Sequence, residues 1–346
     1  MPAASSVSPR GSGRVRRQIA VIGAGVAGLA AARAVAERGL GVHVFEKSRG
    51  LGGRAATRRR DGMGFDHGAQ YFTARSPRFR RAVDSFVEAG LVAVWTPRIV
   101  RLGSDGSREP APEGNRFVGV PGMSSLGRAL AGDLPVSRGT RIAALHRSDD
   151  GHWVPVSDSG EPHETFDAVI VTCPAPQAEL LLRSVSVALA AVCRSASMLP
   201  CWAAMVAFES ALDVDFDAAF VTDEVLAWVS RESSKPGRGS RPECWTLHGA
   251  PEWSASRLEE EPGRVARELF DRFTDLAGVA PRNLAHLDAH RWRFARSAEL
   301  LSVATTVDAE ARLSIAGDWT NGDRVEGAWL SGIQAAESIS ELLGRP

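Results

Sequence analysis

The chain has 346 residues, of which 44% are hydrophobic and 24% charged, as is ordinary for a globular protein able to bury a large core. Its 41 lysines and arginines balance 41 aspartates and glutamates, which excludes a globally basic nucleic-acid-binding protein and a strongly acidic, solvating one. The balance is uneven, because residues 1–81 contain sixteen basic and four acidic side chains.

Residues 1–16 are predicted to form a disordered tail, because they are rich in small residues, proline and arginine and have no apolar period. The apolar stretch Ile19–Ala36 contains three glycines and Arg33, so it is a poor membrane span. Arg16 and Arg17 before it could belong to a twin-arginine export signal, but a strand, a glycine turn and a helix explain these residues better. The four cysteines form no CxxC pair and no zinc-type cluster. We therefore expect a cytoplasmic protein with reduced thiols, no bound metal and no membrane or nucleic-acid partner.

The first predicted elements form a βαβ unit. A buried strand is expected over Gln18–Gly23, an alanine-rich helix over Leu29–Arg38 and a second strand over Gly41–Glu46, joined by a right-handed crossover. The later predicted elements are helices over Arg80–Ala89 and Ser124–Ala131, a hairpin of Thr140–Arg147 and Trp153–Ser157, strands over Phe166–Thr172, Ala203–Phe208 and Leu226–Ser230, a helix over Gly263–Leu276, a strand over Ala311–Ala316 and a helix from Gly327 to Leu343.

A GxGxxG motif lies between the first strand and the first helix. Gly23 permits a tight turn, Gly25 lets the backbone approach a pyrophosphate, and Gly28 allows close helix–strand packing. The helix N-terminus offers free N–H groups to the phosphates. Glu46, eighteen residues after Gly28, can accept hydrogen bonds from ribose hydroxyls, with Lys47 beside it. Together these features predict a bound dinucleotide.

Two further segments favour FAD as that dinucleotide. The segment Ser48–Arg54 can follow the cofactor with its glycine backbone, including Gly53, and Arg54 is expected to contact the pyrophosphate. Asp318 follows a predicted strand and can hold a ribityl hydroxyl. The N-terminus of the last helix can stabilise the negative charge of a reduced flavin. The cofactor-binding residues expected in that helix are Glu326, Gly327 and Ala328.

The element order predicts an α/β fold in which a Rossmann-like FAD-binding domain carries a second, mixed α+β substrate lobe. The FAD-binding domain is expected to be discontinuous, over residues 17–75, 120–185 and 285–346. The substrate lobe is expected over residues 76–119 and 186–284, where tryptophans and short strand-like runs are frequent.

Several motifs between residues 18 and 343 together resemble the renalase-type FAD-dependent oxidoreductases, within the glutathione-reductase-like and amine-oxidase group of flavoproteins. They include FEKSRGLGGRAATRR from residue 45, FDHGAQYFTA from 65, SKPGR from 234, WTLH from 245, HRWRFA from 290 and RVEGAWLSG from 324. The resemblance implies FAD bound without a covalent link. It also implies oxidation of mis-reduced 2- or 6-dihydro isomers of NAD(P)H to NAD(P)+, with O2 accepting the electrons as hydrogen peroxide.

Hydride transfer to a flavin needs positioning and exclusion of water more than an acid or base. Aromatic and uncharged walls suit that task, and the candidates are Gln70, Tyr71, His248 and Trp292. Further candidate walls are Phe72, Trp245 and Trp329. For His248 the resemblance implies an imidazole that can bond the nicotinamide carboxamide, while a core histidine bonded to backbone is an alternative of nearly equal weight.

Two basic features have open interpretations. Lys235 is either a solvated loop residue or, as in amine oxidases, a lysine that holds a water near flavin N5. The run Arg58–Arg60 either attracts an anionic dinucleotide or forms a solvated turn before Asp61 and Gly62.

Two other functions remain possible on the same scaffold. One is oxidation or desaturation of an amine or a secondary metabolite, and the other is a non-catalytic, flavin-binding redox sensor. For the enzyme we expect a small-molecule substrate and O2 as partners, and a monomer or homodimer.

Overall fold

The computed structural model describes residues 16–280, 283–299, 301, 306–322 and 324–344. Most of the predicted tail, residues 1–15, lies outside the described residues. Arg16 is folded onto the protein, because its guanidinium donates to the carbonyl oxygens of Gly39 and Leu40 at 2.8 and 2.6 Å. Arg17 pairs with Asp167 at 2.5 Å. The predicted tail therefore extends one residue too far.

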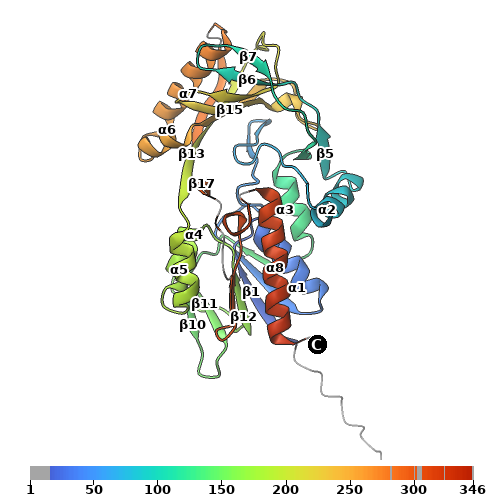
Figure 1. The fold of residues 1–346 in the computed structure, drawn as a ribbon, viewed down its shortest axis with the longest axis vertical. Coiled ribbons are helices and arrows are strands. Elements are labelled where there is room, and N and C mark those ends of the chain that lie inside the picture. Colours follow the sequence, from blue (N-terminus) through green and yellow to red (C-terminus); the bar gives the residue numbers. More distant parts are fainter. Residues whose placement is uncertain (1–15, 281–282, 300, 302–305, 323, 345–346) are drawn as a thin grey trace, which may run out of the picture.

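The lower part of Figure 1 is built on a six-stranded sheet with the order β18-β19-β12-β1-β2-β9. The pairs from β19 to β9 are parallel, whereas β18 is antiparallel to β19. The strands are β1 (Gln18–Ile22), β2 (Gly41–Glu46), β9 (Val136–Arg138), β12 (Ala168–Val171), β18 (Val307–Asp308) and β19 (Leu313–Ile315).

Helices and a hairpin cover the two faces of this sheet. Ile19 and Val21 of β1 face one core with the helices α1 (Val26–Glu37), α3 (Ser124–Ala131) and α8 (Val325–Leu343). The alternate residues Ala20 and Ile22 face a second core. That core is shared with α4 (Ala175–Leu182), α5 (Val187–Ser195) and the hairpin of β10 (Ile142–Arg147) and β11 (Trp153–Ser157). Alternate residues of β1 point to opposite faces of the sheet, and both faces are buried.

The upper part of Figure 1 is an arch formed by a seven-stranded, mixed sheet with the order β17-β13-β16-β15-β14-β6-β7. Two helices, α6 (Pro251–Ser256) and α7 (Pro262–Ala277), pack on it around a separate core. Its strands are β6 (Ile99–Gly103), β7 (Arg108–Pro110), β13 (Met198–Phe208), β14 (Ala218–Thr222), β15 (Leu226–Arg231), β16 (Glu243–Gly249) and β17 (Leu284–Ser297). This arrangement confirms the predicted α/β fold with a Rossmann-like domain and a second, mixed lobe.

Smaller elements lie between the two sheets. The hairpin of β3 (Arg58–Arg60) and β4 (Met63–Phe65) leads toward the cavity described below. The pair β5 (Val92–Trp95) and β8 (Arg116–Gly119) follows the helix α2 (Pro77–Glu88). The helix α2 begins three residues before the predicted Arg80, because the Ser76 hydroxyl caps it and Pro77 suits its first turn.

The packing differs from the predicted division of the chain at three places. Phe79 and Val83 of α2 and Trp95 of β5 share the core of α1 and α8. The helix α5 shares the core of α4 and the Rossmann sheet. In contrast, β17 belongs to the seven-stranded sheet, although residues from 285 onward were expected in the cofactor domain. An amphipathic helix or strand shows in its sequence that one face is buried, but not against which partner. Among the described residues, no helix is long and apolar enough to span a membrane.

Candidate functional site

A cavity of about 1740 Å³ lies between the two sheets. Its wall includes Ile22 at the end of β1, Thr172 after β12 and Gly317 after β19, all at the carboxyl edge of the parallel sheet. The seven-stranded sheet contributes His248 of β16 and Trp292 of β17. The carboxyl edge of such a sheet, where loops and helix N-termini meet, is the usual place for a dinucleotide.

Two glycine segments lie side by side on the cavity wall, and we call them the glycine cradle. Gly23 has φ +107°, and a Cβ on Gly28 would collide with the Gly23 carbonyl, so both glycines are required by the turn. A Cβ on Gly25 would meet nothing within 4 Å, and Gly25 lines the cavity. A Cβ on Gly53 would lie 3.2 Å from the Gly25 Cα. The exposed backbone at Gly25 and Gly53 therefore leaves room for a pyrophosphate beside the N-terminus of α1.

Glu46 and Lys47, at the end of β2 and just after it, lie on the cavity wall. The two carboxylate oxygens of Glu46 accept hydrogen bonds from the N–H groups of Ala24 and Ser48, both at 2.7 Å. Glu46 thus ties the glycine turn to the following loop as well as facing the cavity. Lys47 donates to Gln177 at 3.1 Å.

Arg54 and Asp318 lie on the cavity wall as a bidentate ion pair. The two guanidinium nitrogens of Arg54 donate to the two carboxylate oxygens of Asp318 at 2.8 and 2.6 Å, and one also donates to the Ala295 carbonyl. The sequence places both residues at the cofactor but does not predict that each is the other's partner. The pair joins the second glycine segment to the end of β19 across 264 residues.

The N-terminus of α8 reaches the cavity through Val325 and Ala328. Glu326 does not line it, because its carboxylate accepts from the N–H groups of Arg75 and Ser76 and so anchors the start of α2. Gly327 is also outside the wall, and a Cβ there would collide with the Asn321 carbonyl. Glu326 and Gly327, which were expected at the cofactor, thus lie outside the cavity wall, whereas their neighbours Val325 and Ala328 are part of it.

Three aromatic rings, of His67, His290 and Trp292, form one part of the cavity wall. The ring centroids of His67, His290 and Trp292 lie 4.5 to 5.1 Å apart, and the Trp292 indole donates to the His67 carbonyl at 2.7 Å. Burial, with nearby positive or imidazole charge, lowers the pKa of His67 to about 3 and that of His290 to about 4. Burial, assisted by Lys235, lowers the pKa of His248 to about 4. All three imidazoles are therefore neutral at pH 7.

The other predicted wall residues lie elsewhere. Tyr71 packs against Trp95 and Trp228 outside the cavity wall. Trp245 is fully buried in the core of the seven-stranded sheet. Phe72 and Trp329 both pack on Phe79 in the first core. Their aromatic character alone suggested that these residues line the cavity. Aromatic side chains are equally common in hydrophobic cores, and these four rings pack there.

Gln70 lies behind the wall, in contact with His248. Its Oε1 accepts hydrogen bonds from the Ser230 hydroxyl at 2.5 Å and from the Lys235 ammonium at 3.1 Å. Its Nε2 donates to the carbonyl of Asp66 and lies 3.4 Å from Nε2 of His248. Gln70 was expected on the cavity wall. It lies behind the wall instead, where it contacts His248, which lines the cavity.

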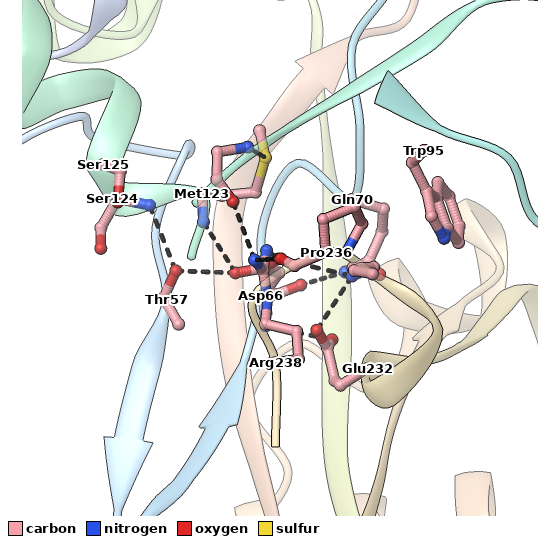
Figure 2. A network of polar contacts seen from close by, with 12 residues as sticks. Thr57, Asp66, Gln70, Trp95, Met123, Ser124, Ser125, Glu232, Pro236 and Arg238 are labelled. Carbon is pink, nitrogen blue, oxygen red and sulfur yellow. Dashed lines mark hydrogen bonds and ion pairs between the residues drawn. The ribbon is translucent and has the colours of Figure 1, made fainter. Parts of the chain in front are cut away.

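A buried ionic network, shown in Figure 2, supports this part of the cavity wall. It consists of Asp66, Glu232, Lys235 and Arg238. The Asp66 carboxylate lies 2.5 Å from Arg238 and 3.5 Å from Lys235, which also lies 3.0 Å from Glu232. Burial alone would raise the pKa of Asp66, but Lys235 and Arg238 hold it below its usual value, whereas burial raises the pKa of Glu232. Lys235 is 2% exposed and outside the cavity wall, so it is not a solvated loop residue.

The same network joins three segments of the protein. Asp66 accepts hydrogen bonds from the Thr57 hydroxyl at 2.7 Å and from the N–H of Met123 at 3.0 Å, just before α3. Glu232 lies in the short 3₁₀ helix Glu232–Ser234 after β15 and accepts from Thr246 of β16 at 2.7 Å. The sequence signals for Asp66, Lys235 and Arg238 were the FDHGAQ and SKPGR motifs, but a charge alone does not reveal a partner about 170 residues away.

The described residues contain no group of three or more His, Cys, Asp or Glu side chains arranged to bind a metal ion. All four cysteines are free.

Comparisons with known proteins agree with this architecture. The sequence profile of flavin-containing amine oxidoreductases matches residues 106–340, and that of an NAD(P)-binding Rossmann-like domain matches residues 21–86. The structure superposes on cyclohexylamine oxidase from Brevibacterium oxydans IH-35A with a TM-score of 0.76 at 13% identity, covering 95% of this chain and 99% of that one. A triple mutant of putrescine oxidase superposes with a TM-score of 0.73 at 13% identity, covering 94% and 98%. At these identities the likeness concerns the fold.

A curated relative, 4,4'-diapophytoene desaturase from Staphylococcus aureus, is 53% identical over 51 residues. The match spans 15% of this chain and only a tenth of the desaturase.

We expect the Gly25→Val variant to be purified without flavin, because its side chain would occupy the open side of the glycine cradle. The absorbance spectrum of the purified protein measures flavin content. Gly263→Val is a matched control, since a Cβ there also meets nothing within 4 Å but Gly263 lies on α7, away from the cavity. Full flavin content in Gly25→Val would show that the cofactor does not pass over Gly25.

We expect Lys235→Met to lower the free energy of unfolding by about 3–5 kcal/mol, because it leaves two buried carboxylates with one cation. Thermal or chemical denaturation measures the change. Lys47→Met is the control, since Lys47 is exposed and bonds only Gln177. The double variant Lys235→Met/Glu232→Gln restores the charge balance and should regain part of the loss. Equal stability of wild type and Lys235→Met would contradict the network.

Proposed function

The chain belongs to the flavin-containing amine oxidoreductase family, and we propose that it is an FAD-dependent oxidase of mis-reduced dihydronicotinamide dinucleotides. The substrates are 2- or 6-dihydro-NAD(P). A hydride with its electron pair leaves the dihydropyridine ring, which becomes aromatic NAD(P)+. O2 then takes up the two electrons, and with protons from solvent it becomes hydrogen peroxide.

The observation that carries this proposal is the charge of the cavity wall. Among its described residues, eleven arginines and one lysine face only three carboxylates, Glu46, Asp158 and Asp318. The diphosphate of one bound cofactor neutralises only part of that excess. A second anionic dinucleotide is attracted by the remainder, whereas a protonated amine is repelled. The basic residues are Lys47, Arg49, Arg54, Arg58, Arg59, Arg128, Arg138, Arg141, Arg291, Arg293, Arg296 and Arg324.

The residues along the first half of the cavity fit FAD. Gly25 and Gly53 leave room for its pyrophosphate, Glu46 faces its ribose, and Asp318 with the N-terminus of α8 faces its flavin end. When bound, FAD supplies the hydride acceptor. The protein then has to hold the nicotinamide ring in place and exclude water.

The wall of His67, His290 and Trp292 suits that second task. Loss of a hydride from a dihydropyridine releases no proton, so the reaction needs no general base. Imidazoles whose pKa lies at about 3 to 4 remain uncharged and offer flat surfaces to the substrate ring. A neutral wall also avoids repulsion of the nicotinamide cation that forms.

His248 is fixed in one state by Gln70. Because Oε1 of Gln70 already accepts two hydrogen bonds, its Nε2 must donate, and Nε2 of His248 must accept. The proton of the imidazole is therefore on Nδ1, consistent with a hydrogen bond to the His67 backbone. This gives the cavity a neutral ring of fixed orientation.

The direct test is anaerobic mixing of the holoenzyme with 6-dihydro-NAD. We expect the visible absorbance of oxidised flavin to bleach, NAD+ to form in equal amount, and O2 to restore the colour with release of hydrogen peroxide. Cyclohexylamine and putrescine are the amine probes. Bleaching by an amine alone would replace the proposal with an amine oxidase, and bleaching by no probe would favour a redox sensor.

We expect the rate of flavin reduction to be flat from about pH 5 to pH 8, because His67, His248 and His290 gain protons only near pH 3 to 4. Stopped-flow absorbance at a series of pH values measures this rate. A fall in rate as the pH drops through about 6.5, the value for an unperturbed histidine, would contradict a neutral wall.

We expect His248→Ala to retain FAD but to reduce its flavin about 10- to 100-fold more slowly, because the substrate ring loses a fixed surface. The exposed residue His146 of β10 gives the control, His146→Ala. Unchanged reduction in His248→Ala would return this histidine to the structural interpretation, a buried ring bonded to backbone.

A further inference from the structure

Two arginines of the cavity wall converge on one hydroxyl group. Arg59 of β3 donates to the Ser124 hydroxyl at 3.4 Å, and Arg128 of α3 donates to the same oxygen at 3.2 Å. Arg128 also donates to the Ser125 hydroxyl at 2.8 Å. Both guanidinium groups line the cavity and are exposed to solvent.

Neither of these arginines has an acidic partner among the residues that the structure describes. Other arginines of the same wall do, since Arg54 pairs with Asp318, and Arg291 and Arg293 pair with Glu259. Burial, together with the charge of Arg59, lowers the pKa of Arg128, as expected for like charges held close together. An anion between the two guanidinium groups would relieve that repulsion.

The surroundings hold this pair of arginines in place next to the aromatic wall. Arg58, beside Arg59 on β3, donates to Nδ1 of His290 at 3.2 Å. The N–H of Ser124 donates to the Thr57 hydroxyl at 3.1 Å, and Thr57 in turn bonds Asp66, as Figure 2 shows. Ser124 is therefore anchored to the buried network. Its hydroxyl, which accepts hydrogen bonds from Arg59 and Arg128, is held in one position.

We propose that Arg59, Arg128 and Ser124 form the binding site for the diphosphate of the dinucleotide that passes through the cavity as substrate. Guanidinium groups bind phosphate oxygens through paired N–H donors, and two of them match the two phosphates of a diphosphate. The cofactor has a different cradle, made of glycine backbone and the N-terminus of α1. The proposal rests on the proposed function, because it assigns a part of the same substrate.

Arg60 is the matched control for this site. It follows Arg59 on β3 and carries the same charge, but it lies outside the described cavity wall and pairs with Asp61 at 3.8 Å. The variants Arg59→Ala, Arg128→Ala and Arg60→Ala therefore remove one charge each, and only the first two remove it from the site.

The first measurement is calorimetric binding of inorganic pyrophosphate to the FAD-loaded enzyme. We expect Arg59→Ala and Arg128→Ala each to weaken it about tenfold or more, as for loss of a charged hydrogen bond, and Arg60→Ala to leave it unchanged. Equal binding in all three variants would overturn the site. Loss of FAD from Arg59→Ala or Arg128→Ala would also overturn it, because the arginines would then hold the cofactor.

The second measurement compares two substrates, 6-dihydro-NAD and the phosphate-free 6-dihydronicotinamide riboside. We expect both site variants to raise KM for the dinucleotide about tenfold without changing kcat, and to leave the riboside unaffected. An unchanged KM in an active enzyme would overturn the site alone. A wild-type enzyme that oxidises neither compound would overturn the proposed function, and with it the assignment to a substrate, even where pyrophosphate still binds.

Discussion

The buried carboxylate of Asp66 is the point on which the arrangement of the cavity depends. It is fully buried, and it binds the lysine and arginine of the SKPGR segment, the hydroxyl of Thr57 and the backbone before α3. Such a charge is stable inside a protein only when all these partners are in place. Because these partners lie before β3, before α3 and after β15, the network ties the seven-stranded sheet to the segments that precede the β3–β4 hairpin and α3. His67, which follows Asp66, is held against Trp292 by the same constraint.

The wall of His67, His290 and Trp292 is uncharged because burial keeps its two imidazoles neutral. The four charged groups of the buried ionic network lie behind this wall, and their two positive and two negative charges balance. Gln70 contacts both this network and His248. The wall therefore presents neutral rings, while the arginines lie around it and along the rest of the cavity. The zero net charge of the chain conceals this division between a cationic cavity and an acidic remainder. A neutral ring-binding surface within a cationic surround suits a ligand with an aromatic head and an anionic body.

Local sequence patterns were sufficient to predict which residues of the Rossmann half lie together on the cavity wall. The turn of Gly23, Gly25 and Gly28 and the carboxylate at Glu46 lie within one βαβ unit, where spacing along the chain determines spacing in the structure. Asp318 was predicted from its position after a strand, and it does lie on the cavity wall. Glu326 and Gly327 lie outside the cavity wall, because their positions are set by contacts with residues 75, 76 and 321 that the sequence does not reveal. The burial of Lys235 could not be predicted from sequence, since two of its three partners, Gln70 and Asp66, are 165 and 169 residues away.

A crystal structure of the FAD-loaded enzyme with NAD+ tests most directly where the substrate binds. We expect the nicotinamide ring to lie between the flavin and the wall of His67, His290 and Trp292, with the diphosphate bound by Arg59 and Arg128. A structure in which NAD+ binds elsewhere, or in which an uncharged amine occupies the ring site while NAD+ is excluded, would contradict it.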